Sequence, residues 1–196
     1  TEHLMNDRIV KHLVYQETVH TDGTVLPLGE TRFYKKQKRV ALRNCGMINP
    51  ECIDEYIGTN GYLALEKVLT SMQPQEVIDT ILASGLRGRG GGGFPTGRKW
   101  QFAANSKSDK KYVVCNADEG DPGAFMDRSV LEGDPHAVLE AMAIAGFAIG
   151  ADEGYIYVRA EYPIAVHRLQ IAIKQAREYG VLGKNIFGTG FNFDIQ

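Results

Sequence analysis

Apolar residues recur at helical spacing in two neighbouring segments of the first half of the chain. The first predicted helix follows Gly61 and places four apolar residues on one face: Tyr62, Leu65, Leu69 and Met72. The second begins with Pro74 at its first position and buries a face made of Val77, Ile78, Ile81 and Leu82. Gly85 comes next, and glycine favours the left-handed backbone that ends many helices.

Beyond residue 98, short apolar runs alternate with longer helical patterns. Strands are predicted at residues 112–115 and 155–158, and a third begins at Phe191. A short helix is expected around residues 99–103, and a longer one from Asp134, as its cap, to Gly150. One more helix ends at Gly180 and has an apolar face made of Tyr162, Val166, Leu169, Ile173 and Ala176. This order predicts an α/β fold, a parallel sheet with flanking helices, which is incomplete because its third strand begins so late in the chain.

The 196 residues are sufficient for one sizeable domain, which we expect over residues 57–196 after an extended lead-in or linker over residues 1–56. The basic run at residues 35–39 lies in that lead-in and is either a solvated face or a contact with a partner. A net charge of -2 argues against nucleic acid as a partner. The longest apolar stretch, residues 141–149, is too short to span a bilayer, and no signal peptide is visible.

Cysteine usage indicates a reducing compartment. The chain has three cysteines, Cys45, Cys52 and Cys115, an odd number at wide spacing that does not suggest a disulfide framework. Cys45 and Cys52 are too far apart in sequence for a convincing metal pair, so no metal site is predicted. A cytoplasmic location is the expectation.

The most informative segment is the glycine loop, defined as residues 88–97. Five of the six residues from 88 to 93 are glycine, which lets backbone approach a ligand closely and aim several N–H groups one way. Arg87, Arg89, Arg98 and Lys99 add positive charge, so the segment suits a phosphate group. The alternative is a flexible surface loop.

Two familiar phosphate-binding motifs do not explain this loop. Residues 88–93 match the Gly-x-Gly-x-x-Gly string of dinucleotide-binding folds, but that motif follows a strand, and here a helix precedes it. The Gly-Lys-Ser/Thr ending of a P-loop is absent. An Arg-Gly-Gly nucleic-acid segment is disfavoured because the pattern occurs once, between two amphipathic helices.

A second cluster follows the predicted strand at residues 112–115. Asn116, Asp118, Glu119 and Asp121 come directly after it, and the carboxyl ends of parallel strands are where ligands bind in open α/β sheets. These side chains could accept hydrogen bonds from a heterocycle or a sugar. A plain Asp/Gly/Pro turn and a divalent metal site are alternatives. Together with the cationic loop, the cluster fits a ligand with phosphate at one end and a polar ring at the other, the form of FMN.

These segments resemble a known family. Residues 84–97 read SGLRGRGGGGFPTG, Lys99 and Trp100 follow, and residues 116–128 read NADEGDPGAFMDR. This pattern resembles the FMN-binding subunit of complex I and the diaphorase subunits of electron-bifurcating hydrogenases and NAD-dependent formate dehydrogenases. The resemblance covers residues 40–196 and implies a Rossmann-like domain.

The resemblance implies roles by position. The FMN-binding positions would be Gly88, Arg89, Gly90, Gly91, Lys99, Asn116, Asp118 and Glu119. Phe94 and Phe102 would stack on NADH, and Asp121 would lie near its nicotinamide ribose, at a position where relatives often carry glutamate. No side chain is assigned as a proton-transferring catalyst.

The resemblance also implies an activity and partners. NADH or NADPH would exchange a hydride with FMN, and electrons would pass to iron–sulfur clusters of a larger hydrogenase or dehydrogenase complex. The ligands of the family's [4Fe–4S] cluster lie outside this chain, and the implied partners are a [2Fe–2S] subunit and a hydrogenase or dehydrogenase catalytic subunit. The alternatives are a flavin subunit of a membrane ferredoxin-oxidising complex, and a scaffold that keeps the fold without flavin.

Overall fold

The computed structural model describes Met5, residues 25–121 and residues 123–196 of the chain. The chain divides into two compact units, residues 1–41 and residues 42–196. The described residues of the first unit form two short 3-10 helices, η3 (Leu28–Glu30) and η4 (Tyr34–Lys36). Much of the expected lead-in, residues 1–4 and 6–24, lies outside the described residues. In the basic run, Lys35, Lys36 and Lys38 are exposed, and the Arg39 guanidinium lies 5.3 Å from the centroid of the Tyr34 ring.

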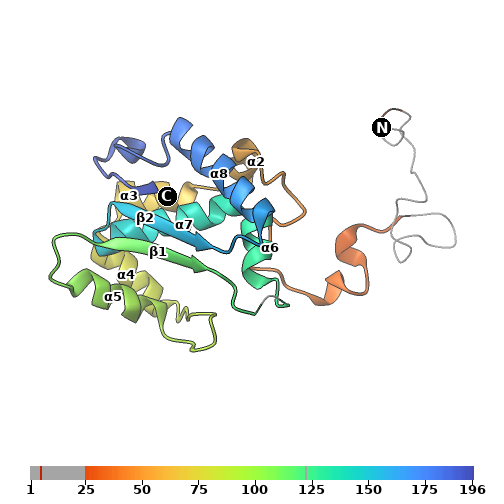
Figure 1. Cartoon of the computed structure of the whole chain (residues 1–196), viewed down its shortest axis with the longest axis horizontal. Coiled ribbons are helices and arrows are strands. Elements are labelled where there is room, and N and C mark those ends of the chain that lie inside the picture. Colours follow the sequence, from red (N-terminus) through yellow and green to blue (C-terminus); the bar gives the residue numbers. More distant parts are fainter. Residues whose placement is uncertain (1–4, 6–24, 122) are drawn as a thin grey trace. The chain divides into compact units, whose positions relative to one another are not determined.

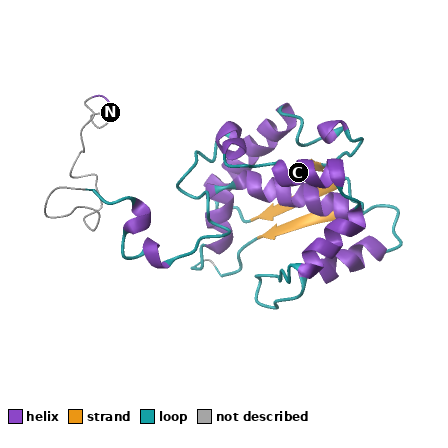
Figure 2. Cartoon of the chain, turned by 180° about the vertical axis from the view of Figure 1, so that it is seen from behind, coloured by secondary structure: helices purple, strands orange, loops and turns teal. Residues whose placement is uncertain are grey.

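The second unit contains a parallel sheet and seven α-helices (Figures 1 and 2). The helices are α2 (Ile53–Gly58), α3 (Leu63–Ser71), α4 (Pro74–Ala83), α5 (Thr96–Asn105), α6 (Met126–Gly133), α7 (Pro135–Ile149) and α8 (Pro163–Glu178). The strands are β1 (Tyr112–Ala117), β2 (Glu153–Val158) and β3 (Asp194–Ile195), and a 3-10 turn, η5 (Ile186–Gly188), precedes β3. Among the described residues, no helix has both the length and the apolar character that a membrane crossing requires.

The sheet is parallel, in the order β1-β2-β3, which confirms the predicted α/β class. Tyr112 pairs with Glu153 at the start of β1, and Ala117 pairs with Val158 at its end. β1 and β2 therefore finish side by side. The residues that follow these two strands share one edge of the sheet.

The two faces of the sheet differ in the part of the chain that the structure describes. Val113, Cys115 and Ile156 point to one face and pack against the apolar core under α7 and α8. Val114 and Tyr157 point to the other face and are 63% and 62% exposed. Figure 1 looks onto this open face, and the view from behind in Figure 2 has helices in front of the strands. The described helices thus cover one face only.

Helix α7 is the centre of the core. It is apolar on nearly all sides and packs against α3, α4, α5, α8 and the sheet. Gly146 on this helix and Gly154 on β2 leave room for the fully buried Phe193: a Cβ at Gly146 would lie 2.6 Å from the Phe193 ring, and one at Gly154 would lie 2.9 Å from it. These glycines are therefore required by packing.

Several sequence predictions are confirmed. Pro74 begins α4, where Gln73 and Glu76 form a capping box, and Gly85 adopts the left-handed backbone (φ 68°) after that helix. Helix α7 begins at Pro135 and is followed by Gly150 in the same conformation. Asp134 occupies the cap position, but one of its carboxylate oxygens accepts a 2.8 Å hydrogen bond from the Asn44 side chain.

Other features differ from the predictions. Helices α2 and α6 were not expected. The second unit begins at Leu42, so residues 42–56, which were assigned to the lead-in, belong to it, and Ile53 and Tyr56 are core residues. Strand β3 is shorter than predicted because Phe193 exchanges backbone hydrogen bonds with Gly183 instead of with β2.

Candidate functional site: the glycine loop and the carboxyl ends of the strands

The glycine loop is closed at its base by backbone hydrogen bonds. The N–H of Gly88 donates to the carbonyl of Phe94 at 2.9 Å, and the N–H of Thr96 donates to the carbonyl of Leu86 at 2.9 Å. The loop thus leaves α4 and returns to α5 as a hairpin-like excursion. In Figures 1 and 2 it projects from these helices in the direction in which the β1 arrow points.

The tip of the loop offers backbone donors and open space. Among the described residues, none accepts a hydrogen bond from the N–H groups of residues 89–93. Gly91 (φ 98°) and Gly93 (φ 59°) adopt left-handed backbone, which requires glycine there. A Cβ placed on Gly90 or Gly92 would have no neighbour within 4 Å. Unpaired donors with an open approach form a surface on which an anion or a flat ring can bind closely.

A cavity of about 320 Å³ lies beside the loop. It is bounded by the loop, by α5, by the outer edge of β1 and by α7, and its lining includes Gly88, Phe94 and Lys99 as well as Trp100 and Tyr112. Three of the residues predicted to bind FMN or NADH therefore share one cavity. The lining is mainly apolar and aromatic, and the exposed Lys99 brings a positive charge, a combination suited to a planar ring with a charged substituent.

Phe94 and Phe102 form a pair next to this cavity. Their ring centroids are 6.4 Å apart with the planes tilted by 45°. Phe94 is 51% exposed and Phe102 is 64% exposed. A core role for Phe102, the ordinary explanation for a phenylalanine on a short helix, is therefore excluded by its exposure. Both rings are accessible to a stacking partner.

The acidic cluster lies where β1 ends. Strand β1 extends two residues beyond its predicted end and includes Asn116, which lies on the open face of the sheet. The Asn116 Oδ1 atom accepts a 3.2 Å hydrogen bond from the N–H of Asp118. The Asp118 carboxylate lies 3.9 Å from a guanidinium nitrogen of Arg159, the first residue after β2. Asn116 and Asp118 are thus at the carboxyl edge of the sheet, as predicted.

Glu119 has a different environment from its neighbours. It is 7% exposed, has left-handed backbone (φ 52°), and its carboxylate accepts hydrogen bonds from the N–H groups of Met126 and Arg128 at the start of α6. Burial favours the neutral acid, but these N–H groups and the nearby Tyr162 hydroxyl outweigh it, so the pKa of Glu119 is below its ordinary value. The Glu119 carboxylate therefore stabilises the N-terminus of α6, and a contact with flavin stays a prediction.

Asp121 lies in the exposed turn before α6, where its carbonyl accepts a hydrogen bond from the N–H of Ala124. Pro122, in the same turn, is outside the described residues. Asp127, on the first turn of α6, has a pKa raised by burial and by the Glu119 charge. The structure records no direct contact between this acidic cluster and the glycine loop among the described residues.

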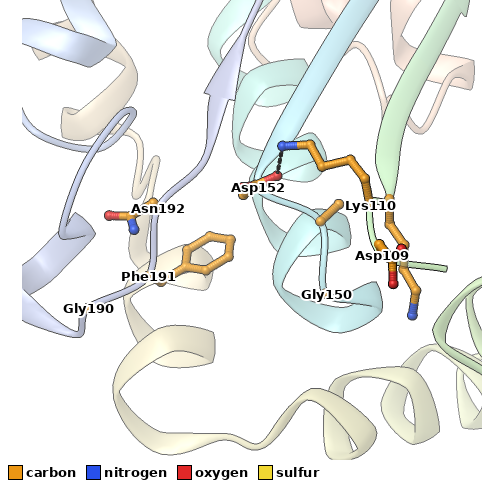
Figure 3. Close-up of a pocket in the computed structure, with 9 residues that line it drawn as sticks. Asp109, Lys110, Gly150, Asp152, Gly190, Phe191 and Asn192 are labelled. Carbon is orange, nitrogen blue, oxygen red and sulfur yellow. Dashed lines mark hydrogen bonds and ion pairs between the residues drawn. The ribbon is translucent and has the colours of Figure 1, made fainter. Parts of the chain in front are cut away.

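A second pocket, also of about 320 Å³, lies where the strands begin, at the end of the sheet opposite the acidic cluster (Figure 3). Its lining includes Asp109, Lys110, Asp152, Phe191 and Asn192, and Lys110 forms a 2.5 Å ion pair with Asp152. None of the predicted site residues lines it. Three of the predicted site residues line the loop cavity instead, so the loop cavity is the better candidate.

The described residues contain no cluster of three histidine, cysteine or carboxylate side chains able to hold a metal ion, and Cys45, Cys52 and Cys115 form no disulfide. Sequence reasoning missed three residues of the site region: Arg128, Arg159 and Tyr162. Arg159 was identifiable in principle, because it is the first residue after the second strand, just as Asp118 is the first residue after the first strand.

Comparison with known proteins identifies the family. Residues 81–195, more than half of the chain, match the family described as the Nuo51 FMN-binding domain. The chain belongs to this family. The match begins within α4 and includes the glycine loop, all three strands and the acidic cluster, so the two segments that form the candidate site both lie inside the Nuo51 FMN-binding domain.

Individual relatives agree with this assignment. The chain is 64% identical over 169 residues to the NADP-reducing hydrogenase subunit HndC of Solidesulfovibrio fructosivorans, covering 86% of this chain and 34% of the relative. It is 52% identical over 143 residues to a subunit of the NADH-quinone oxidoreductase of Aquifex aeolicus (strain VF5), covering 73% of this chain and 33% of the relative. The chain thus spans about a third of the length of these relatives.

A solved structure shares the fold. The crystal structure of an NAD+-reducing [NiFe]-hydrogenase in its H2-reduced state matches with a TM-score of 0.59 and 25% sequence identity, covering 94% of this chain and 28% of that chain. The similarity extends over nearly all of this chain.

Proposed function

We propose that the glycine loop and the carboxyl ends of β1 and β2 together bind FMN, and that the protein uses it to exchange hydride with NADH or NADPH. The observation that carries this proposal is the loop tip, where the N–H groups of residues 89–93 have no acceptor among the described residues and the space in front of Gly90 is open. Membership of the Nuo51 FMN-binding domain family supports the same ligand.

The residues at hand fit the chemistry of FMN. Backbone N–H groups of Arg89, Gly90 and Gly91 would donate to the flavin and its phosphate, with the Lys99 ammonium adding charge. The N–H of Gly88 is paired with the Phe94 carbonyl, so Gly88 would contact the flavin through its backbone surface only. Asn116 and Asp118 would accept hydrogen bonds from ring N–H or ribityl hydroxyl groups. When bound, FMN supplies a two-electron acceptor for hydride that can release electrons singly.

The nicotinamide nucleotide would bind over the exposed aromatic pair. Phe94 and Phe102 offer two accessible rings beside the loop cavity, where an adenine can stack. Asp121 is exposed near the start of α6, from which it could reach a ribose hydroxyl. The chain would thus orient both reactants and leave the redox chemistry to them.

Electrons would pass onward within a larger assembly. The relatives named above are subunits of a hydrogenase and of a quinone oxidoreductase, and this chain spans about a third of their length. We propose iron–sulfur clusters as the acceptors, with a [2Fe–2S] subunit and a hydrogenase or dehydrogenase catalytic subunit as partners. A cytoplasmic location is part of the same proposal.

The test is a spectrum followed by an anaerobic titration. The purified protein should show a flavin absorbance band, and stoichiometric NADH or NADPH should bleach it. Absence of flavin, with no binding of added FMN, would support a non-catalytic scaffold and overturn the proposal. Bound flavin that neither nucleotide reduces would instead favour the ferredoxin-linked alternative.

A further inference from the structure

Arg159 and Asp118 occupy equivalent places on adjacent strands. Ala117 and Val158 are the last paired residues of β1 and β2, so Asp118 and Arg159 are the next residues on each strand. An Arg159 guanidinium nitrogen, Nη2, lies 3.9 Å from Asp118 Oδ2. The Arg159 side chain is 20% exposed and that of Asp118 is 38% exposed. The pair therefore forms part of the surface at the carboxyl edge of the sheet.

Arg159 also lies against a buried aromatic ring. Its guanidinium lies 5.6 Å from the centroid of the Tyr162 ring, and Arg128 lies 5.4 Å from the same centroid. Tyr162 is 5% exposed and occupies the cap position of α8, so the ring is a fixed support. Cation–π contacts of this kind restrict the orientation of a guanidinium.

The arrangement is not explained by stability alone. The Nε atom of Arg159 is buried and has no hydrogen-bond partner among the described residues. A buried donor without an acceptor lowers stability, so its presence in a native structure needs another reason. The ion pair itself, loose and partly exposed, adds little in return.

We propose that Arg159 is a positioning residue of the flavin site, which holds the Asp118 carboxylate in place and offsets its charge. This inference rests on the proposed function. Asp118 is close in sequence to Glu119, Asp121 and Asp127, and FMN itself carries a phosphate. Without a neighbouring cation, Asp118 would repel the phosphate and the reduced, anionic ring, and its side chain would be free to turn away.

The experiment measures FMN affinity and the flavin midpoint potential in the purified protein. Arg159→Met should weaken FMN binding about tenfold, because the Asp118 carboxylate is then unbalanced and repels the phosphate. It should also lower the midpoint potential, because an unbalanced carboxylate disfavours the anionic reduced flavin. Arg159→Lys, which keeps the charge, should recover most of the potential.

A double substitution separates positioning from folding. Asp118→Asn alone should raise the potential, and Arg159→Met combined with Asp118→Asn should return it close to wild type, since neither charge remains. Arg177→Met is the matched control: Arg177 pairs with Asp194 at 2.8 Å, at the start of β3 and so at the other end of the sheet. It should change neither quantity.

Each outcome decides between the two proposals. If wild type binds FMN but Arg159→Met leaves affinity and potential unchanged, the positioning role is wrong and the proposed function stands. If Arg159→Met and Asp118→Asn act independently on the potential, Arg159 does not act through Asp118. If wild type binds no FMN, the proposed function fails, and this inference fails with it.

Discussion

The hydroxyl of Tyr56 on α2 donates a 2.5 Å hydrogen bond to the carboxylate of Glu140, in the middle of α7. The same carboxylate accepts 3.0 Å hydrogen bonds from the N–H groups of Tyr62 and Leu65, at the start of α3. Helix α3 thus has no local side-chain cap and takes its cap from α7. Glu140 is 7% exposed, so it connects three helices from inside the core.

Replacing Glu140 by alanine should therefore destabilise the protein strongly. The change leaves two backbone donors and one hydroxyl without an acceptor, and each unpaired buried group costs about 1–3 kcal/mol. We expect the free energy of unfolding in urea to fall by about 3 kcal/mol or more. Glu178→Ala, which removes an exposed partner of Lys174, should change it by less than about 0.5 kcal/mol. A similar small change for Glu140→Ala would contradict this role.

His136 should make stability depend on pH. Its Nδ1 lies 2.9 Å from the Tyr62 hydroxyl and its Nε2 lies 3.2 Å from Gln175 Oε1. Because Gln175 Oε1 can only accept, the neutral ring donates from Nε2 and accepts from Tyr62 at Nδ1. Burial lowers the pKa of His136, although the Gln175 hydrogen bond opposes the shift.

The direction in which pH changes stability follows from which state, folded or unfolded, binds the proton at the higher pH. The unfolded chain takes up a proton near the ordinary histidine pKa of about 6.5, and the folded protein does so only at lower pH. Stability is therefore full above that pH and declines as the pH falls toward the folded-state pKa. Tyr56 and Tyr62, whose pKa values are raised by burial, stay neutral throughout. Unfolding curves at pH 7.5 and 5.5 should show the decline, and His136→Gln should reduce it. An equal decline in both proteins would refute the assignment.

Phe102→Ala should affect the nucleotide and spare the fold. Because Phe102 is 64% exposed, its loss should change the free energy of unfolding by less than about 0.5 kcal/mol. Aromatic stacking is worth about 0.5–1.5 kcal/mol, so the NADH concentration that half-reduces the flavin should rise about threefold. Flavin content should stay at the wild-type level. Joint loss of flavin and stability would mean that the ring packs in the protein rather than against the nucleotide.

The spacing of apolar residues, together with the glycines and prolines at the ends of helices, predicted most of the core. On the predicted face after Pro74, Val77 and Ile78 are buried as expected, but Leu82 is 39% exposed, so its predicted burial is wrong. The helix expected from Asp134 to Gly150 and the two longer strands appear because apolar spacing and proline and glycine preferences act locally. Helix α6 was not predicted, because its start depends on a contact with a residue outside the helix. It follows Phe125, which adopts left-handed backbone (φ 49°), and its N-terminus is stabilised by Glu119 rather than by a cap residue of its own.

The candidate site was predictable in part. Glycine spacing and acids at a strand end pointed to the loop and to Asp118, since both signals lie in short stretches of sequence. The contact with Arg159 was not predictable, because it depends on the register of β1 and β2. The Asn44 hydrogen bond to Asp134 is similar, since it joins residues 90 positions apart.

We propose that backbone at Gly90 lines the FMN site, and an FMN titration of two variants tests this role most directly. Neither Gly90 nor Gly92 adopts left-handed backbone, and a Cβ at either has no neighbour within 4 Å, so both variants should fold. Gly92→Ala should bind FMN within about threefold of wild type, whereas Gly90→Val should lose at least about tenfold by blocking close approach. A folded Gly90→Val protein with wild-type FMN affinity would contradict the account.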